Sequence, residues 1–173
     1  MRARLTRLAL ALATLACALP SGASATAIYG YPLAAHCPAA GVADKVDRWG
    51  MYACNCTSYV AWSLQANGQS IDWFEPGRMD AKNWPLVARE ESIPLGHAPR
   101  VGAVAVWPKV EPPFGHVAYV TRLDAGGTFD VAEYNFRPAL QGRRFEFDRR
   151  RGVDAKGVLF IYVPQAAREH APR

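Results

Sequence analysis

The order of the apolar segments limits the fold of this chain more than any other feature. Before residue 100 the apolar residues recur with helical spacing, whereas after residue 100 they form short runs typical of strands. Helices that precede a group of strands indicate an α+β fold, and a hairpin turn at Asp124-Ala125-Gly126-Gly127 favours antiparallel pairing. We therefore expect N-terminal helices packed on a mostly antiparallel sheet of about five strands.

The residues that end each segment define the expected elements. The first helix begins at Cys56 or Thr57 and ends near Ala66, before the stop signal Asn67-Gly68. A second, shorter helix is expected over 80–91, and a further short helix could cover 42–49. The expected strands cover 101–107, 116–123, 128–135, 143–147 and 158–163.

Residues 1–25 have the three parts of a secretory signal peptide. Three arginines and no acid accompany an apolar run over 8–19, and Ala23-Ser24-Ala25 forms a cleavage site of small residues. The run is too short to span a membrane. We expect cleavage near Ala25 or at Ala27, and a secreted or periplasmic protein with no stable membrane span. Lipoprotein processing at Cys17 is disfavoured, because Thr14 stands where a lipobox usually has Leu.

Removal of this segment lowers the net charge of the chain. The whole chain has 20 Lys and Arg against 15 Asp and Glu, a formal net charge of +5. Loss of the three arginines in 1–25 leaves 17 against 15, a net charge of +2. No basic patch is interleaved with aromatic residues, so nucleic-acid binding is not expected. The rest of the chain suits one domain over 26–165, followed by a flexible tail over 166–173.

Three cysteines remain after the expected cleavage, namely Cys37, Cys54 and Cys56. In an oxidising compartment two of them can pair and one is left over. Cys54 and Cys56 are too close in the chain for an easy disulfide, so either could bond to Cys37. If Cys54 does so, Cys56 is a free thiol.

Metal binding is the competing interpretation of these cysteines. A zinc site would combine them with His36, but Cys54-x-Cys56 lacks the usual two-residue spacing and no second close pair follows. Asp44 and Asp47 do not belong to a calcium-loop sequence. No metal and no cofactor are therefore expected. The run Arg149-Arg150-Arg151 is expected to be a solvated turn.

Cys56 stands where the first helix begins. The positive end of a helix dipole favours a thiolate, so Cys56 is a candidate nucleophile. A base for it could come from the hairpin. A turn centred between Ala125 and Gly126 places His116 opposite Asn135, with Glu133 as the diagonal neighbour on the same face.

These groups suit the hydrolysis of an amide by a thiolate, in which an imidazole moves the proton and a carboxylate or amide orients the ring. The register of the hairpin stays open, since a shift by one residue would put His116 and Glu133 on opposite faces. The alternative interpretation is a core histidine, an ordinary edge carboxylate and structural cysteines.

Several segments resemble the CHAP family, the cysteine, histidine-dependent amidohydrolases/peptidases. They are the nucleophile segment 55–62, the sequence Asn83-Trp84-Pro85, the histidine region 102–107 with 115–120, and the segment 131–135. Their order and spacing agree over roughly 45–136. The resemblance implies a papain-like fold and hydrolysis of amide bonds in the peptide part of peptidoglycan.

The resemblance also implies roles for individual residues. Cys56 would be the nucleophile, His116 the general base and acid, and Glu133 the orienting group with help from Asn135. The backbone N–H of Cys56 would be one oxyanion donor. Further candidates for the oxyanion or substrate site are Asn55, Tyr59 and Trp107.

We expect a monomeric amidase or endopeptidase that acts on peptidoglycan peptides, and the sequence does not distinguish these two activities. One alternative is an amidase acting on another peptide-like substrate. The other is a catalytically silent, wall-associated binding or structural module.

Overall fold

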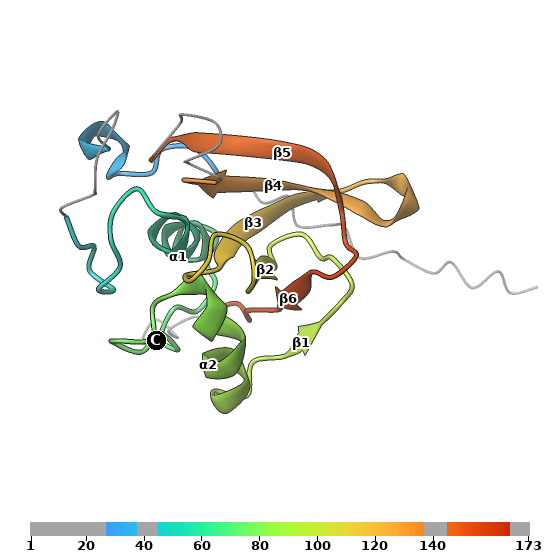
Figure 1. The fold of residues 1–173 in the computed structure, drawn as a ribbon, viewed down its shortest axis with the longest axis horizontal. Coiled ribbons are helices and arrows are strands. Elements are labelled where there is room, and N and C mark those ends of the chain that lie inside the picture. Colours follow the sequence, from blue (N-terminus) through green and yellow to red (C-terminus); the bar gives the residue numbers. More distant parts are fainter. Residues whose placement is uncertain (1–26, 38–44, 137–144, 167–173) are drawn as a thin grey trace, which may run out of the picture.

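Six strands form one antiparallel sheet in the order β1-β6-β2-β3-β4-β5 (Figure 1). The computed structural model describes residues 27–37, 45–136 and 145–166. Its helices are η1 (Ala34–His36), α1 (Cys56–Ala66), η2 (Ala81–Asn83), α2 (Trp84–Glu90) and η3 (Ala125–Gly127). Its strands are β1 (Leu95–Gly96), β2 (Val104–Trp107), β3 (His116–Leu123), β4 (Thr128–Tyr134), β5 (Phe147–Asp154) and β6 (Leu159–Ile161).

Both α-helices contribute to the core on one face of this sheet. Helix α1 lies against β3 and β4, whereas α2 lies near β1 and β6 (Figure 1). Because strand side chains alternate between faces, Val104, Val117, Tyr119 and Ala132 join the helices in the larger apolar cluster. The alternate residues fill a smaller cluster on the other face, which includes Ala105, Ala118, Val120, Val131 and Phe160.

The expected α+β class, with helices packed on an antiparallel sheet, is confirmed. The sheet has six strands, one more than expected, because it also includes the two-residue strand β1, which pairs with β6. The strand expected over 143–147 instead begins at Phe147 and ends at Asp154. The expected second helix is divided into η2 and α2, with Pro85 in the first turn of α2. The short helix considered over 42–49 is not present over 45–49, where Val46 instead pairs with Tyr52.

Two further expectations concern the ends of the chain. The expected signal peptide lies outside the described residues, and so does the expected tail beyond residue 166. Within the described ranges, no helix has the length and apolar character needed to cross a membrane.

The β3–β4 hairpin has the expected register only at the end distant from its turn. Tyr119 lies opposite Ala132 and Val120 lies opposite Val131, as expected, and the same register would bring His116 level with Asn135. Next to the turn, Leu123 pairs with Phe129, one residue out of that register, because the turn is centred on Gly126. A β-bulge between Val120 and Arg122 absorbs the difference.

The loop before β3 packs closely on η2. The Lys82 N–H donates a hydrogen bond to the Phe114 carbonyl at 2.9 Å. Gly115 follows with a φ of +80°, and a Cβ atom there would lie 2.7 Å from the backbone nitrogen of Lys82. Two separate constraints therefore require glycine at position 115: the positive φ of its backbone and the close approach of η2.

We expect Gly115→Ala to destabilise the fold more than Gly126→Ala does. Both residues have a φ near +80°, but nothing lies within 4 Å of a Cβ at Gly126. Gly126→Ala should cost only the strain of the left-handed conformation, about 1 kcal/mol, and Gly115→Ala a further ~1–3 kcal/mol for the clash. Urea unfolding of both variants measures the difference, and equal losses would contradict the close contact.

Candidate active site

A buried hydrogen bond joins His116 and Glu133. The histidine is the first residue of β3, the glutamate lies on β4, and their Nε2 and Oε2 atoms are 2.8 Å apart. The side chains are 1% and 0% exposed, so bulk water does not screen their interaction. The hairpin register explains the contact, because it puts both side chains on the same face of the sheet.

Arg150 from β5 is a second partner of Glu133. Its Nη2 donates to Glu133 Oε2 at 2.9 Å, and its Nε donates to Oε1. The guanidinium carbon lies 3.8 Å from the ring centroid of Phe136 and 4.8 Å from that of Trp107. The expectation of a solvated turn at Arg149-Arg150-Arg151 is therefore wrong.

The register of β5 decides which of the three arginines reaches the site. A shift between Phe129 and Val131 in the β4–β5 ladder brings Arg150 opposite Val131. Without this irregularity, the pairing of Phe129 with Val153 would continue and bring Arg151 opposite Val131. Arg150 thus shares the face of Glu133, whereas Arg151 is exposed.

Cys56 begins α1 and is a free, partly exposed thiol. Its side chain lies close enough to the His116 ring to raise the pKa of that ring. Because Nε2 of that ring faces Glu133, Nδ1 is the nitrogen left for the sulfur. Helix α1, strand β3 and strand β4 thus bring together a thiol, an imidazole and a carboxylate.

Electrostatics in this cluster favour the charged forms of His116 and Glu133. Burial opposes a charge on His116, but the Cys56 sulfur and the hydrogen bonds to Cys56 and Glu133 outweigh burial and raise the pKa of His116 to about 9. Burial also disfavours the charged carboxyl, yet the hydrogen bonds from His116 and Arg150 hold the pKa of Glu133 below its usual value.

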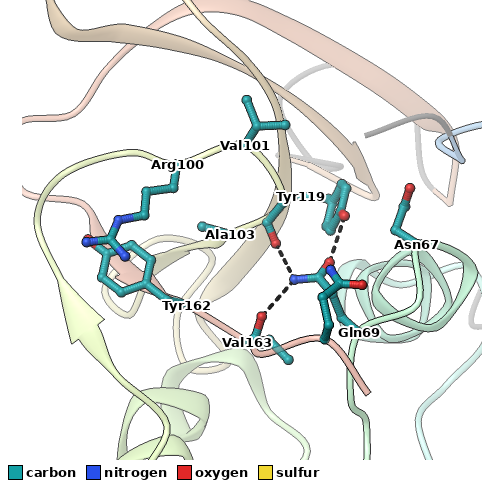
Figure 2. A pocket seen from close by; sticks show the side chains of 10 residues that line it. Asn67, Gln69, Arg100, Val101, Ala103, Tyr119, Tyr162 and Val163 are labelled. Carbon is teal, nitrogen blue, oxygen red and sulfur yellow. Dashed lines mark hydrogen bonds between the residues drawn. The ribbon is translucent and has the colours of Figure 1, made fainter. Parts of the chain in front are cut away.

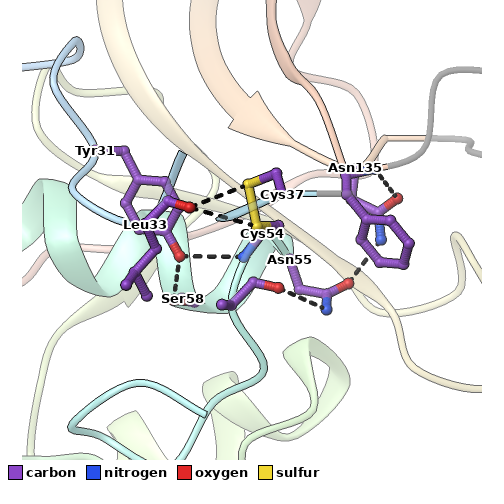
Figure 3. The surroundings of a disulfide bond; sticks show 9 residues. Tyr31, Leu33, Cys37, Cys54, Asn55, Ser58 and Asn135 are labelled. Atoms are coloured by element: carbon purple, nitrogen blue, oxygen red, sulfur yellow. Dashed lines mark hydrogen bonds between the residues drawn. A yellow bond between two sulfur atoms is a disulfide. The ribbon is translucent and has the colours of Figure 1, made fainter. Parts of the chain in front are cut away.

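A disulfide between Cys37 and Cys54 fixes the segment before α1 (Figure 3). The Cys54 N–H donates to the Tyr31 hydroxyl at 3.1 Å, and that hydroxyl shares a 2.6 Å hydrogen bond with Ser58 (Figure 3). The N-terminal segment is therefore bonded to both sides of Cys56. The disulfide also occupies the sulfurs of Cys37 and Cys54, so neither is available to form a bond with Cys56.

Asn135 lies beside the site but does not face His116. Its Nδ2 donates to Asn55 Oδ1 at 2.6 Å, and its Oδ1 accepts a hydrogen bond from the Phe145 N–H at 3.1 Å. No described hydrogen bond joins Asn135 to His116. Its amide instead connects the end of β4 to Asn55, the residue before Cys56 (Figure 3).

The structure separates the remaining two candidates for the substrate site. Tyr59 has no exposed surface, and its hydroxyl donates to the Ile28 carbonyl at 2.7 Å. We therefore assign Tyr59 to the core and not to substrate contact. Trp107 is partly exposed at the end of β2, with its ring centroid 6.0 Å from that of His116.

A pocket of about 340 Å³ lies elsewhere, and no candidate catalytic residue lines it (Figure 2). Gln69 is one of its lining residues, and its amide donates to the carbonyls of Gly102 and Val163 and accepts a hydrogen bond from the Tyr119 hydroxyl (Figure 2). All the polar atoms of this side chain are used within the protein, which indicates a structural role. Across the part of the chain that the structure covers, no group of three or more His, Cys, Asp or Glu residues could hold a metal ion.

Comparison with known proteins gives one family. A sequence model of the CHAP domain matches residues 46–135. A protein of Streptococcus mutans serotype c that is named as a hydrolase is 29% identical over 93 residues, which are 53% of this chain and 41% of that protein. The probable autolysin SsaALP of Staphylococcus aureus is 30% identical over 97 residues, which are 56% of this chain and 35% of that protein. The chain thus spans less than half the length of either relative.

The fold also resembles a solved structure, that of an N-acetylmuramoyl-L-alanine amidase from Staphylococcus aureus. The TM-score is 0.57 and the sequences are 21% identical, over 70% of this chain and 33% of that chain. At this identity the comparison supports the fold alone.

We expect alkylation under native, non-reducing conditions to label Cys56 but neither Cys37 nor Cys54. Disulfide sulfurs do not react with an alkylating agent, whereas Cys56 is free and partly exposed. Peptide mapping by mass spectrometry identifies the labelled residue, and a reduced, unfolded sample shows that all three peptides can be detected. Native labelling of Cys37 or Cys54 would contradict the disulfide.

We expect Cys56→Ala to lower the pKa of His116. The substitution removes the Cys56 contributions that favour the imidazolium, while burial and Glu133 remain. The wild-type ring should keep its proton up to about pH 9, and the variant ring should lose it at lower pH. An NMR titration of the histidine rings measures both midpoints. An unchanged midpoint would contradict close contact between Cys56 and His116.

Proposed function

Because the chain belongs to the CHAP domain family, we propose that it is a cysteine hydrolase that cleaves amide bonds in the peptide part of peptidoglycan. The observation that carries this proposal is the buried His116–Glu133 pair within reach of the free thiol at the start of α1. The names of the similar proteins, an autolysin and an N-acetylmuramoyl-L-alanine amidase, support a cell-wall substrate.

In the first half of the reaction, the Cys56 thiolate attacks the carbonyl carbon of the amide. The carbonyl oxygen becomes an oxyanion, and the backbone N–H of Cys56 can stabilise it, since the first amides of a helix have no partner within the helix. The C–N bond then breaks as the His116 imidazolium gives its proton to the leaving amine. The products are the free amine and a thioester on Cys56.

In the second half, His116 acts as a base. It takes a proton from a water molecule, which attacks the thioester carbonyl, and the C–S bond breaks to release the carboxylic acid and return the Cys56 thiolate. Glu133 holds the ring by its Nε2 through both halves, so that Nδ1 stays directed at the sulfur and the substrate. The Asn135–Asn55 hydrogen bond positions the segment that carries the nucleophile.

We further propose that the protein acts outside the cytoplasm, in the periplasm or as a secreted enzyme. The Cys37–Cys54 disulfide supports this location, because disulfides persist in oxidising compartments. An amidase and an endopeptidase would use the same residues, so the position of the cleaved bond has to be measured.

We expect Cys56→Ser and His116→Ala each to reduce hydrolysis of purified peptidoglycan by roughly 100-fold or more, because each variant lacks a group that takes part in bond cleavage. Loss of turbidity of a peptidoglycan suspension gives the rate. Mass spectrometry of the soluble fragments identifies the cleaved bond and distinguishes an amidase from an endopeptidase.

Surface variants such as Arg151→Met serve as controls for folding and should retain the wild-type rate. Full activity in Cys56→Ser would overturn the assignment of the nucleophile. A wild-type protein that binds peptidoglycan without releasing any fragment would identify a silent binding module instead.

A further inference from the structure

We propose that Arg150 is a positioning residue of this site: it fixes Glu133 as an oriented carboxylate and balances the negative charge that Glu133 adds beside the thiolate–imidazolium pair. The proposal deepens the proposed function and rests on it for the roles of Cys56 and His116. The argument begins with the contacts of Glu133. This side chain has no exposed surface, so its charge must be compensated within the protein.

The geometry of the Arg150–Glu133 contact holds both oxygens of the carboxylate. Two nitrogens of the guanidinium bind the two oxygens, and Oε2 also receives the His116 ring. Such a fork fixes the plane of a carboxylate, which a single hydrogen bond does not. The direction of Oε2, and with it the direction of the imidazole, therefore depends on Arg150.

The surroundings of Arg150 keep the guanidinium in place. Phe136 and Trp107 both lie within 5 Å of its central carbon, and the side chain is 25% exposed. Stacking on aromatic rings suits the planar guanidinium and would be lost by an ammonium group on a flexible stem. The charge is thus held beside Glu133 by contacts other than the ion pair itself.

A count of charges shows what Arg150 adds. In the reactive form Cys56 is negative, His116 positive and Glu133 negative, so these three groups carry one net negative charge. Arg150 brings the sum to zero. Asp148 lies opposite Glu133 in the β4–β5 ladder and is a further acidic group beside it.

Removal of Arg150 should therefore favour proton uptake by the cluster. The site would then hold an uncompensated negative charge, and the pKa of the remaining groups would rise because a nearby positive charge is lost. The thiolate of Cys56 would form only at higher pH. Lysine at this position would keep most of the charge but lose the fork.

The test is the rate of Cys56 alkylation by iodoacetamide as a function of pH, measured on the full chain. This reaction needs the thiolate but no peptidoglycan, so it remains informative even if the proposed substrate is wrong. We expect Arg150→Met to move the acid limb of the profile up by roughly one pH unit. Arg150→Lys should leave the limb near its wild-type position.

Arg151→Met is the matched control, because it removes the same charge from the neighbouring, exposed residue of β5. Its profile should superimpose on that of the wild type. A wild-type profile for Arg150→Met, or an equal shift for Arg151→Met, would overturn the proposal. If Arg150→Met does not fold, the proposal is tested by the hydrolysis kinetics described next. There Arg150→Lys and the double variant Glu133→Gln/Arg150→Met, which removes both charges of the pair, are compared with Glu133→Gln.

Hydrolysis kinetics test whether Arg150 acts through Glu133. Arg150→Lys and Glu133→Gln should each lower kcat by tenfold or more with little change in KM, because neither side chain is placed to bind substrate directly. In combination with Glu133→Gln, substitution of Arg150 by Met or Lys should add less than twofold, since its partner is already absent. Losses that multiply would show that Arg150 acts independently of Glu133 and would contradict the proposal, as would a wild-type kcat for Arg150→Lys.

Discussion

The need to pair one buried carboxylate, that of Glu133, determines how the strands align at the end of the sheet where the candidate site lies. Glu133 has no exposed surface, and a buried charge is costly unless it is paired and hydrogen-bonded. Its partners come from both neighbouring strands, His116 from β3 and Arg150 from β5. Three strands must therefore keep one exact register here. The same pairing that satisfies the carboxylate also aligns the imidazole with the start of α1.

Patterns that repeat along the chain allowed much of this arrangement to be predicted. Helix α1 follows from its apolar spacing and from the Asn67-Gly68 stop, and the β3–β4 hairpin follows from two apolar runs around a glycine-rich turn. The contact between His116 and Glu133 could be predicted from the same patterns, because side chains on a strand alternate strictly between the two faces of the sheet. The turn was placed half a residue from its true centre, and the bulge in β3 compensated for that error.

The features that the sequence did not reveal depend on contacts between distant segments. Nothing in Arg149-Arg150-Arg151 distinguishes the middle arginine, because the choice is made by a register shift in the β4–β5 ladder. The Asn135–Asn55 hydrogen bond joins residues 80 positions apart and has no local pattern. An apolar ring with a polar tip, such as that of Tyr59, suits a core as well as a binding site, and only its burial separates the two.

The bulge between Val120 and Arg122 divides the β3–β4 hairpin into two parts whose pairing registers differ by one residue. On one side the pairing is set by the loop around Gly126, and on the other by the needs of a buried charge. A change of one residue in the loop can be absorbed where the two registers meet. The tip of the hairpin can thereby gain or lose one residue without altering the pairing at the opposite end of the same two strands.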